Sequence, residues 1–457
     1  MSKPKEYASM TKDKLMTYTF GALLVIAVVS SVMWSQVTPT NALTGQPLMN
    51  LGLTVAIICL IAVGVAVGTD FMLYKLVSDS PLNTMSAAVF GLIVALSYSL
   101  GLPVMARVDV DATAIGLTTA PEAFLYVALI SLIGLVLFKK IIRTRVNPAA
   151  AAKLIVLLPF INSALLAKEH YAGMEAGGLS MPLLSGPIGH QVLGNNGLLS
   201  FVEYLQGCYD LPTKVTGTYS DFNWLMIVEK FHGWIGGASA IAVIIVGIAL
   251  FVLARRFIKW RITLTFFASV ALMALLMSLI YGGEADVRLV FTLFIGSSIF
   301  LGFFMATDPA TTPLTYKGQL VFGVGLGVLT VLIQTYMNFF GGSILALVIM
   351  NLTSPLLDRI GRGKPTTETK EPKLPKAKQF TSVKTYDCIR CGACMRVCCH
   401  KLSPILIKEA FDKMNVEKMA KLNADYCTGC GHCSFVCPAR IDLKGSILRA
   451  KSMLRQQ

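Results

Sequence analysis

The sequence predicts an all-α polytopic membrane protein with about ten transmembrane helices and a small, largely helical C-terminal domain. Three observations lead to this fold class. Of the 457 residues, 54% are hydrophobic and only 14% are charged, whereas soluble domains carry about 25% charged residues. Apolar runs of the length that a bilayer requires recur along the chain. Behind the last of these runs, nine of the eleven cysteines crowd between Cys388 and Cys437.

A helix needs about 20 apolar residues to cross the core of a bilayer. Ten segments meet or approach this length, and the fifth and tenth are the shortest. They cover residues 15–35, 51–69, 84–102, 121–139, 152–167, 234–254, 262–281, 288–307, 318–339 and 342–357. The first 14 residues hold four lysines and no small-residue cleavage site follows them. We therefore expect an uncleaved first span rather than a signal peptide.

The basic residues orient these segments. Lys and Arg gather in the N-terminal tail, in "KKIIRTRVNPAAAAK" after the fourth segment, in "RRFIKWR" after the sixth and in the tail after the tenth. Ten crossings that start inside place all four stretches in the cytoplasm, as the positive-inside rule requires. The same bias explains the net charge of +15, so we expect no nucleic-acid partner. The protein should lie in the cytoplasmic (inner) membrane, with both termini and the C-terminal domain in the cytoplasm.

The long loop after the fifth segment divides the membrane part into two sets of five helices. An odd number of helices in each set would invert the second set relative to the first, as in inverted-repeat transporters. After Asp358, "RGKPTTETKEPKLPKAK" has the composition of an extended linker. The predicted parts are a cytoplasmic tail (1–14), a first membrane half (15–167), an extracytoplasmic loop (168–233), a second membrane half (234–357), a Lys/Pro-rich linker (358–381) and the C-terminal domain (382–457).

Two copies of C-x2-C-x2-C-x3-C lie in the C-terminal domain. In this pattern the close triplet binds one [4Fe–4S] cluster and the fourth cysteine binds the other. The predicted ligand sets are Cys388, Cys391, Cys394 and Cys437 for a first cluster, and Cys427, Cys430, Cys433 and Cys398 for a second. Zinc sites use pairs of C-x2-C rather than triplets with a trailing cysteine. The pattern therefore favours a dicluster ferredoxin domain.

Residues beside the motifs complete this interpretation. Gly392, Gly429 and Gly431 should relieve crowding where backbone amides turn toward the cluster. Apolar residues between the two motifs recur at near-helical spacing, which predicts a largely α-helical domain. Cys399 stands where a proline usually follows the fourth cysteine, and it is either a spare ligand or a bystander. Two clusters in series would carry single electrons and perform no bond chemistry.

Two parts of the chain resemble known proteins. The region "CIRCGACMRVCCHKLSP…CTGCGHCSFVCPARI" resembles the ferredoxin region of the C subunit of the Rnf complex. The membrane region resembles the D subunit of Rnf and the B subunit of the sodium-pumping NADH:quinone reductase. The stretches that carry this second resemblance are "SPLNTMSAAVFGLIVALSYSLGLP", "RTRVNPAAAAKLI", "LGFFMATDPATTPLTYKGQLVFGVGLGVLTVLI" and "LALVIMNLTSPLLDR". Their order along the chain matches the family.

The resemblance implies flavin in the membrane part. In that family one FMN is esterified to the Thr of an S-G-A-T motif, on the outer side after the fifth span. The corresponding stretch here is "GGLSMPLLSG", where Ser180 is the only hydroxyl in register, and residues 167–212 contain no Thr. We therefore do not expect a covalent FMN.

A noncovalent flavin, FMN or riboflavin, is the alternative that the resemblance implies. Asn147, in an Asn-Pro step, and Asp308, Thr311 and Thr312, in "DPATTP", match the family pattern. Thr144 departs from it, because a first Asn is expected there. Asp and Thr also cap helices. The "DPATTP" residues could therefore form a polar helix terminus instead of a flavin site.

Three of the five histidines, His170, His190 and His232, lie in or beside the predicted outer loop. They would suit haem or metal ligation if no flavin binds on the outer side. Ordinary polar residues are the simpler interpretation.

Three functions are compatible with these expectations. The first is an electron-transfer subunit of an Rnf-like membrane oxidoreductase, which works with other membrane and cytoplasmic subunits and with a ferredoxin or dehydrogenase, coupled to Na⁺ or H⁺ movement. The second is a membrane-anchored ferredoxin that exchanges electrons with quinone and pumps no ions. The third is a non-redox transporter with a cluster-bearing sensor. The scarcity of ionisable residues within the spans argues against the third function.

Overall fold

The computed structural model describes residues 6–35, 49–76, 82–98, 120–142, 146–156, 234–281, 285–294, 298–336, 342–362, 365–366, 372–379 and 383–456. Helices dominate these residues, and the sheet found among them consists of two three-residue strands. The predicted all-α fold class is therefore confirmed, together with a helical C-terminal domain. We call the helices up to residue 362 the membrane body, and residues 383–456 the cysteine-rich domain.

The first group of membrane-body helices contains the described residues up to 156. It comprises α1 (Lys12–Ser35), α2 (Leu51–Leu76), α3 (Thr84–Leu96), α4 (Ala120–Ile133), which continues as the π-helix η2 (Gly134–Ile142), and α5 (Pro148–Val156). The backbones of α2 and α3 approach closely, because a Cβ atom on Gly91 would lie 2.6 Å from the carbonyl oxygen of Ala62. Small residues allow membrane helices to pack in this way.

Among the described residues from 234 onward, the second group begins with a 3₁₀ turn, η3 (Ile235–Gly237). It continues with α11 (Ala240–Leu253), α12 (Trp260–Tyr281), α13 (Ala285–Phe294), α14 (Ser298–Phe300), which runs into the π-helix η4 (Leu301–Met305), α15 (Tyr316–Tyr336) and α16 (Gly342–Leu357). Gly323 and Gly327, one turn apart on α15, face Thr265 and Ser269 of α12. This spacing of small residues brings α12 and α15 together.

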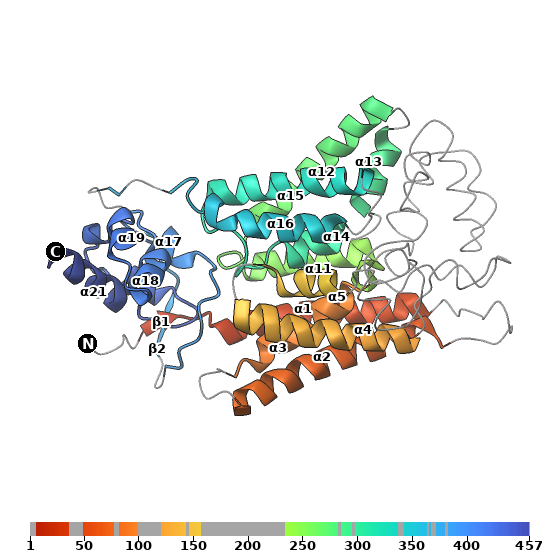
Figure 1. The fold of residues 1–457 in the computed structure, drawn as a ribbon, viewed down its shortest axis with the longest axis horizontal. Coiled ribbons are helices and arrows are strands. Elements are labelled where there is room, and N and C mark those ends of the chain that lie inside the picture. Colours follow the sequence, from red (N-terminus) through yellow and green to blue (C-terminus); the bar gives the residue numbers. More distant parts are fainter. Residues whose placement is uncertain are drawn as a thin grey trace.

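The two groups lie side by side in one bundle. Figure 1 shows α2, α3 and α4 on one side, α12, α13, α15 and α16 on the other, and α1, α5 and α11 between them. By length and composition, α1, α2, α12 and α15 can each cross a membrane, and shorter apolar helices cover 84–96, 123–138, 240–253 and 343–357. These helices agree with a multi-pass membrane protein. The count of ten and the inverted repeat stay predictions.

One helix boundary differs from its predicted span for a local reason. The helix α5 begins at Pro148, whereas the predicted span begins at residue 152. Asn147 causes the earlier start, because its side-chain oxygen accepts hydrogen bonds from two backbone amides of the first turn, at 3.1 and 3.2 Å. An Asn before a helix and a Pro at its first position are both favourable there.

The cysteine-rich domain is built from short helices around a core of its own. Its elements are α17 (Ala393–Arg396), α18 (Pro404–Asp412), α19 (Val416–Lys421), the 3₁₀ turn η5 (Ala424–Tyr426), α20 (His432–Phe435) and α21 (Leu443–Arg455). Each cysteine motif contains a short helix, and a longer helix follows it. The pair α17 and α18 therefore corresponds to the pair α20 and α21. The core includes Leu402, Ile407 and Ile447, and Leu314 of the membrane body packs into it.

The N-terminal segment contacts the cysteine-rich domain before it enters α1. Strand β1 (Glu6–Ala8) pairs antiparallel with β2 (Ala377–Gln379) of the predicted linker. Arg440 donates a hydrogen bond of 2.6 Å to the carbonyl oxygen of Ala8, and the amide of Lys12 donates one of 3.0 Å to Pro438. The beginning of the chain and the cysteine-rich domain therefore lie at the same end of the bundle (Figure 1).

Candidate redox site

The eight motif cysteines line two separate pockets, four to each pocket. The first pocket is lined by Cys388, Cys391, Cys394 and Cys437, together with apolar residues of α18 and α21. The second is lined by Cys398, Cys427, Cys430 and Cys433, together with Leu402 and Ile447. In each pocket three cysteines come from one motif and the fourth from the other. The structure thus brings together the two predicted sets of thiols.

The backbone around these thiols repeats in the same way. Gly392 and Gly431, each just after the second cysteine of a motif, have positive φ angles of 71° and 82°. One residue before that cysteine, Arg390 and Gly429 have φ angles of 50° and 75°. A positive φ is favourable for glycine and unusual for other residues. The predicted role of the three glycines in turning the backbone agrees with these angles.

The electrostatics of the pockets fit a positively charged metal core. Burial raises the pKa of Cys388 and of Cys433 to about 12 and that of Cys437 to about 11, and neighbouring cysteines add to each shift. The pKa of Cys394 rises well above its usual range for the same reasons. Four buried thiolates would repel one another without a cation between them. Four thiols around one pocket also match the ligand number of a [4Fe–4S] cluster.

Cys399, His432 and His400 lie close to the second set of thiols. The sulfur of Cys399 lies 3.3 Å from His432 Nδ1, and the ligand atoms of Cys399, Cys430 and His432 all lie within 4.8 Å of one another. His400 has a different environment, because its two ring nitrogens contact the carbonyl oxygen of Thr366 at 2.9 Å and the hydroxyl of Thr428 at 3.1 Å. His400 therefore joins the linker to the domain. Cys399 lies beside the second set of thiols.

A cavity of about 540 Å³ separates the cysteine-rich domain from the membrane body. Ligand pockets typically have volumes of about 300–1,000 Å³ and mostly apolar walls. Four aromatic rings of the membrane body line the cavity: Phe90, Phe138, Phe303 and Phe304. From the other side it is lined by Tyr386 and by Cys388, which also lines the first thiol pocket. The cavity therefore reaches the first set of thiols.

Three of the residues predicted to bind flavin line this cavity: Asn147, Asp308 and Thr311. All three also stabilise local structure. Asn147 caps α5, and its amide nitrogen donates to the carbonyl oxygen of Met305 (3.3 Å). The carboxylate of Asp308 accepts hydrogen bonds from the amide of Ala310 (3.2 Å) and the hydroxyl of Thr311 (3.1 Å). Their polar groups thus shape the wall of the cavity.

Thr312 is the fourth residue predicted to bind flavin that the structure describes. The hydroxyl of Thr312 donates to the carbonyl oxygen of Asp308 (2.6 Å), and Thr312 is buried behind the cavity wall. Ser180, His170, His190 and His232 lie outside the described residues. The predictions that rest on these four residues stay predictions.

The sequence did not point to three polar residues at one edge of the cavity: Lys12, Asp70 and Asn83. Lys12 donates a hydrogen bond of 3.2 Å to the side-chain oxygen of Asn83, and the backbone amide of Asn83 donates one of 2.9 Å to the carboxylate of Asp70. Lys12 and Asp70 are buried. Asp70 could have been identified from the sequence, because it is an acidic residue that directly follows a predicted span. Charged residues in the membrane part of a protein usually have a function.

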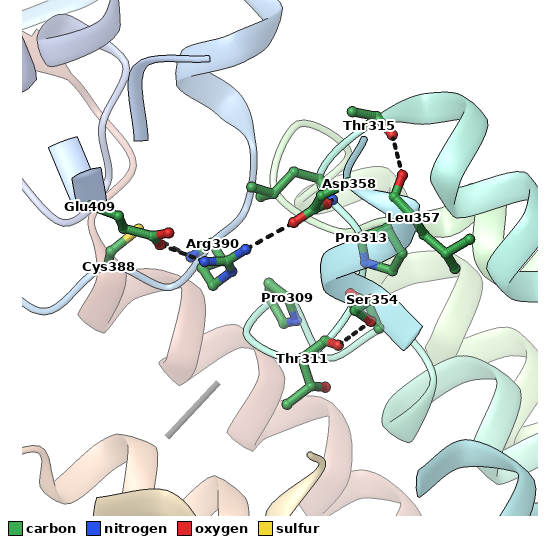
Figure 2. A network of polar contacts seen from close by, with 12 residues as sticks. Pro309, Thr311, Pro313, Thr315, Ser354, Leu357, Asp358, Cys388, Arg390 and Glu409 are labelled. Carbon is green, nitrogen blue, oxygen red and sulfur yellow. Dashed lines mark hydrogen bonds and ion pairs between the residues drawn. The ribbon is translucent and has the colours of Figure 1, made fainter. Parts of the chain in front are cut away.

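Arg390 was missed as well. One of its guanidinium nitrogens lies 3.0 Å from a carboxylate oxygen of Asp358, at the end of α16, and another contacts Glu409 of α18. Figure 2 shows Arg390 between the two carboxylates, with Cys388 beside Glu409. A comparison of the two motifs could have identified this residue, because "CIRC" has Arg at the position where "CTGC" has Gly.

Comparisons with known proteins agree with this arrangement. Residues 10–366 match the model of the NQR2, RnfD, RnfE family, and residues 387–441 match a 4Fe-4S dicluster domain. One relative is the D subunit of the Na⁺-translocating ferredoxin:NAD⁺ oxidoreductase complex of Acetobacterium woodii. The chain is 34% identical to it, over 32% of this chain and 43% of the relative.

Two further relatives carry related names. The chain is 30% identical to the D subunit of the ion-translocating oxidoreductase complex of Aliivibrio salmonicida, over 46% of this chain and 62% of the relative. It is 31% identical to the D subunit of the proton-translocating ferredoxin:NAD⁺ oxidoreductase complex of Clostridium ljungdahlii, over 29% and 40%. The matches thus span about half the length of these relatives. The family model covers well over half of this chain, which therefore belongs to the NQR2, RnfD, RnfE family and ends in a 4Fe-4S dicluster domain.

Proposed function

We propose that this chain is an electron-transfer subunit of an Rnf-like, ion-translocating membrane oxidoreductase. The observation that carries the proposal is the position of Cys388, which lines both the first thiol pocket and the cavity shared with the membrane body. A redox centre held at Cys388 would adjoin any ligand in that cavity. The dicluster domain and the membrane body would then form one continuous route for electrons.

Two [4Fe–4S] clusters are the redox centres of the proposal. The ligand sets are Cys388, Cys391, Cys394 and Cys437 for cluster 1, and Cys427, Cys430, Cys433 and Cys398 for cluster 2. When bound, such clusters accept and release single electrons. The chain supplies buried thiols, apolar walls and backbone amides that point at sulfur, for example the amide of Arg390 at 3.3 Å from Cys388 Sγ. Hydrogen bonds to sulfur are one of the factors that set cluster potentials.

The cavity is the proposed site of a noncovalent flavin, FMN or riboflavin. Its volume and its aromatic walls suit a planar ring system. Asn147, Asp308 and Thr311 present polar groups at the wall, and Thr312 supports that wall from behind. A quinone is the second occupant that the apolar walls would accept. We do not propose a covalent FMN at Ser180 or a haem at His170, His190 and His232.

The orientation and the partners follow from the charge pattern and the names of the relatives. The basic stretches support a cytoplasmic position for the cysteine-rich domain. Relatives are named as D subunits of ferredoxin:NAD⁺ oxidoreductase complexes. By analogy, a reduced ferredoxin or a dehydrogenase would exchange electrons with the domain, and further membrane and cytoplasmic subunits would complete the complex. One of these relatives is named for Na⁺ and the other for protons, so we assign no coupling ion.

A second candidate is a membrane-anchored ferredoxin that exchanges electrons with quinone and pumps no ions. The observation that favours it is the sequence departure at "GGLSMPLLSG", which lacks the Thr of the family's covalent flavin site. Both candidates require iron–sulfur clusters. They differ in ion movement, which membrane vesicles that contain the whole complex would report.

Cofactor analysis of the purified protein tests the proposal. We expect about eight iron atoms with acid-labile sulfide per chain, flavin that is released on denaturation, and no haem in the pyridine spectrum. Zinc without labile sulfide would overturn the clusters, and flavin that stays attached would overturn the noncovalent site. Vesicles that hold the complex should take up Na⁺ or H⁺ when a reduced donor is supplied. Electron transfer without uptake would favour the second candidate.

A further inference from the structure

Arg390 has a positive φ at a position of the cysteine motif where the second motif has a glycine. The equivalent residue of the second motif is Gly429, and both have a positive φ. An arginine is unfavourable there, because its Cβ crowds the backbone in the left-handed region. Unfavourable conformations of this kind persist where surrounding structure enforces them, and they cluster at functional sites. The side chain of Arg390 should therefore have a role that a glycine could not fill.

The side chain of Arg390 connects the cysteine-rich domain to the membrane body. Its ion pair with Asp358 is shielded from solvent, with exposed side-chain fractions of 16% for Arg390 and 4% for Asp358. Glu409 of α18 contacts another nitrogen of the same guanidinium. Exposed ion pairs contribute little, but a guanidinium held between two carboxylates in a shielded site has fixed geometry. Arg390 therefore makes a directed contact between the cysteine-rich domain and the membrane body (Figure 2).

Asp358 in turn holds the segment of the membrane body that enters the cysteine-rich domain. Its second carboxylate oxygen accepts a hydrogen bond of 2.6 Å from the amide of Leu314. The side chain of Leu314 packs into the core of the cysteine-rich domain, in the same cluster as Cys394. One carboxylate therefore binds Arg390 on the domain and the loop on the membrane body.

The backbone of Arg390 also contacts the first set of thiols. Its amide donates a hydrogen bond of 3.3 Å to Cys388 Sγ. The same residue therefore docks the domain and contacts a thiol that lines the inter-domain cavity.

We propose that Arg390 is a positioning residue that latches the cysteine-rich domain onto the membrane body through Asp358 and so holds Cys388 against the inter-domain cavity. The inference rests on the proposed function, because it assumes a redox centre at Cys388. It goes beyond that function in naming the contact that keeps the thiol and the cavity together. The contact combines residues of the membrane family region and of the dicluster region.

Two variants test the latch, and each preserves the surrounding structure. Arg390→Gly installs the residue of the second motif, so the backbone keeps its conformation without strain and the domain should retain full iron content. Asp358→Asn keeps the oxygen that accepts the Leu314 amide and removes the charge. Glu417→Gln is the matched control, because Glu417 forms an exposed ion pair with Lys421 within the cysteine-rich domain.

The first measurement is hydrogen exchange of the full-length protein in the segment around Leu314. We expect about tenfold faster exchange in Arg390→Gly and Asp358→Asn, the factor that corresponds to the loss of one charge-assisted hydrogen bond. Glu417→Gln should exchange like the wild type. This measurement needs no electron transfer.

The second measurement is a redox titration of the two iron–sulfur centres by electron paramagnetic resonance. Arg390→Gly should lower the potential of one centre and leave the other unchanged, because a positive charge beside Cys388 favours the reduced state. Arg390→Lys should restore that potential, since the charge is kept. Arg390→Lys should not restore the slow hydrogen exchange around Leu314, because an ammonium group lacks the planar guanidinium that contacts both Asp358 and Glu409.

Wild-type exchange rates around Leu314 in Arg390→Gly and Asp358→Asn would overturn the latch, even if the potential in Arg390→Gly changed. A wild-type protein that contains both clusters and passes no electrons to its membrane body would overturn the proposed function instead. In that case exchange and potential would still decide whether Arg390 is a latch. The two failures are therefore distinguishable.

Discussion

The ammonium group of Lys259 binds both oxygens of Thr312, at 2.7 Å from the carbonyl and 3.0 Å from the hydroxyl. A third hydrogen bond of 2.8 Å goes to the carbonyl oxygen of Pro309. Lys259 is buried just before α12, so one side chain holds the "DPATTP" loop against the second helix group. This loop forms part of the cavity wall and leads to the segment that enters the cysteine-rich domain.

Lys259→Met should destabilise the protein by about 1–3 kcal/mol, because it leaves two buried acceptor oxygens and one part-buried acceptor oxygen without their donor. Thermal unfolding of the detergent-solubilised protein measures the effect. Lys317→Met is the control, since Lys317 is exposed at the start of α15. If both variants melt at the same temperature, Lys259 does not hold the loop.

The titration of Lys259 predicts a pH dependence of stability. Burial is the main cause that lowers the pKa of Lys259 from 10.5 to about 7; the charge of Arg390 acts in the same direction, and the carboxylates of Asp358 and Asp308 oppose the shift. The folded state then loses this proton as the pH rises through about 7, whereas the unfolded state keeps it until about 10.5. Between these values the unfolded state binds more protons, so the contribution of Lys259 to the free energy of unfolding rises with pH.

Comparison of the melting temperature at about pH 7 and about pH 9 tests this sign. The wild type should gain more stability, or lose less, than Lys259→Met over this interval, because the variant lacks the titrating group. Lys317→Met should follow the wild type. A steeper rise in Lys259→Met than in the wild type would contradict the sign.

The packing of α2 against α3 gives a prediction that is independent of the redox site. Gly91→Val should destabilise the membrane body by about 1–3 kcal/mol, because its Cβ would lie 2.6 Å from the carbonyl oxygen of Ala62. Gly64→Val is the matched control within α2, since no atom lies within 4 Å of a Cβ built there. Thermal unfolding in detergent should separate the two, and equal effects would show that helix propensity alone is responsible.

The sequence predicted those features that form within a short stretch of the chain, namely the cysteine motifs and the apolar helices. The cysteine spacing predicted which four thiols meet in each pocket, because each triplet lies within one short turn-and-helix unit. Apolar runs predicted the helices for the same reason. The π-helical stretches η2 and η4 have no comparable signal, since a helix with either hydrogen-bond pattern presents the same apolar residues.

The rest of the site depends on the docking of distant segments. Arg390 and Asp358 are 32 residues apart, and Lys12 and Asn83 are 71 apart. A separation of this size in the sequence does not predict that two residues are in contact. Strand β1 was predicted only as part of a basic tail, because a three-residue strand acquires its partner from the linker at the other end of the chain. The cavity is lined by residues of both the membrane body and the cysteine-rich domain. The sequence could suggest some of these residues one by one, but it could not show that they lie around the same cavity.

The exchange of the fourth cysteine between motifs gives the last prediction. Cys437→Ser changes the second motif, yet Cys437 lines the pocket of the first triplet. This variant should therefore lose the paramagnetic signal that Cys388→Ser also loses, and its iron should fall from about eight to about four atoms per chain. Cys399→Ser is the matched control, because Cys399 lies beside the second pocket and outside both predicted ligand sets. It should keep both signals. If Cys437→Ser instead lost the signal that disappears in Cys427→Ser, each motif would bind its own cluster, and the assignment of Cys437 and Cys398 would have to be reversed.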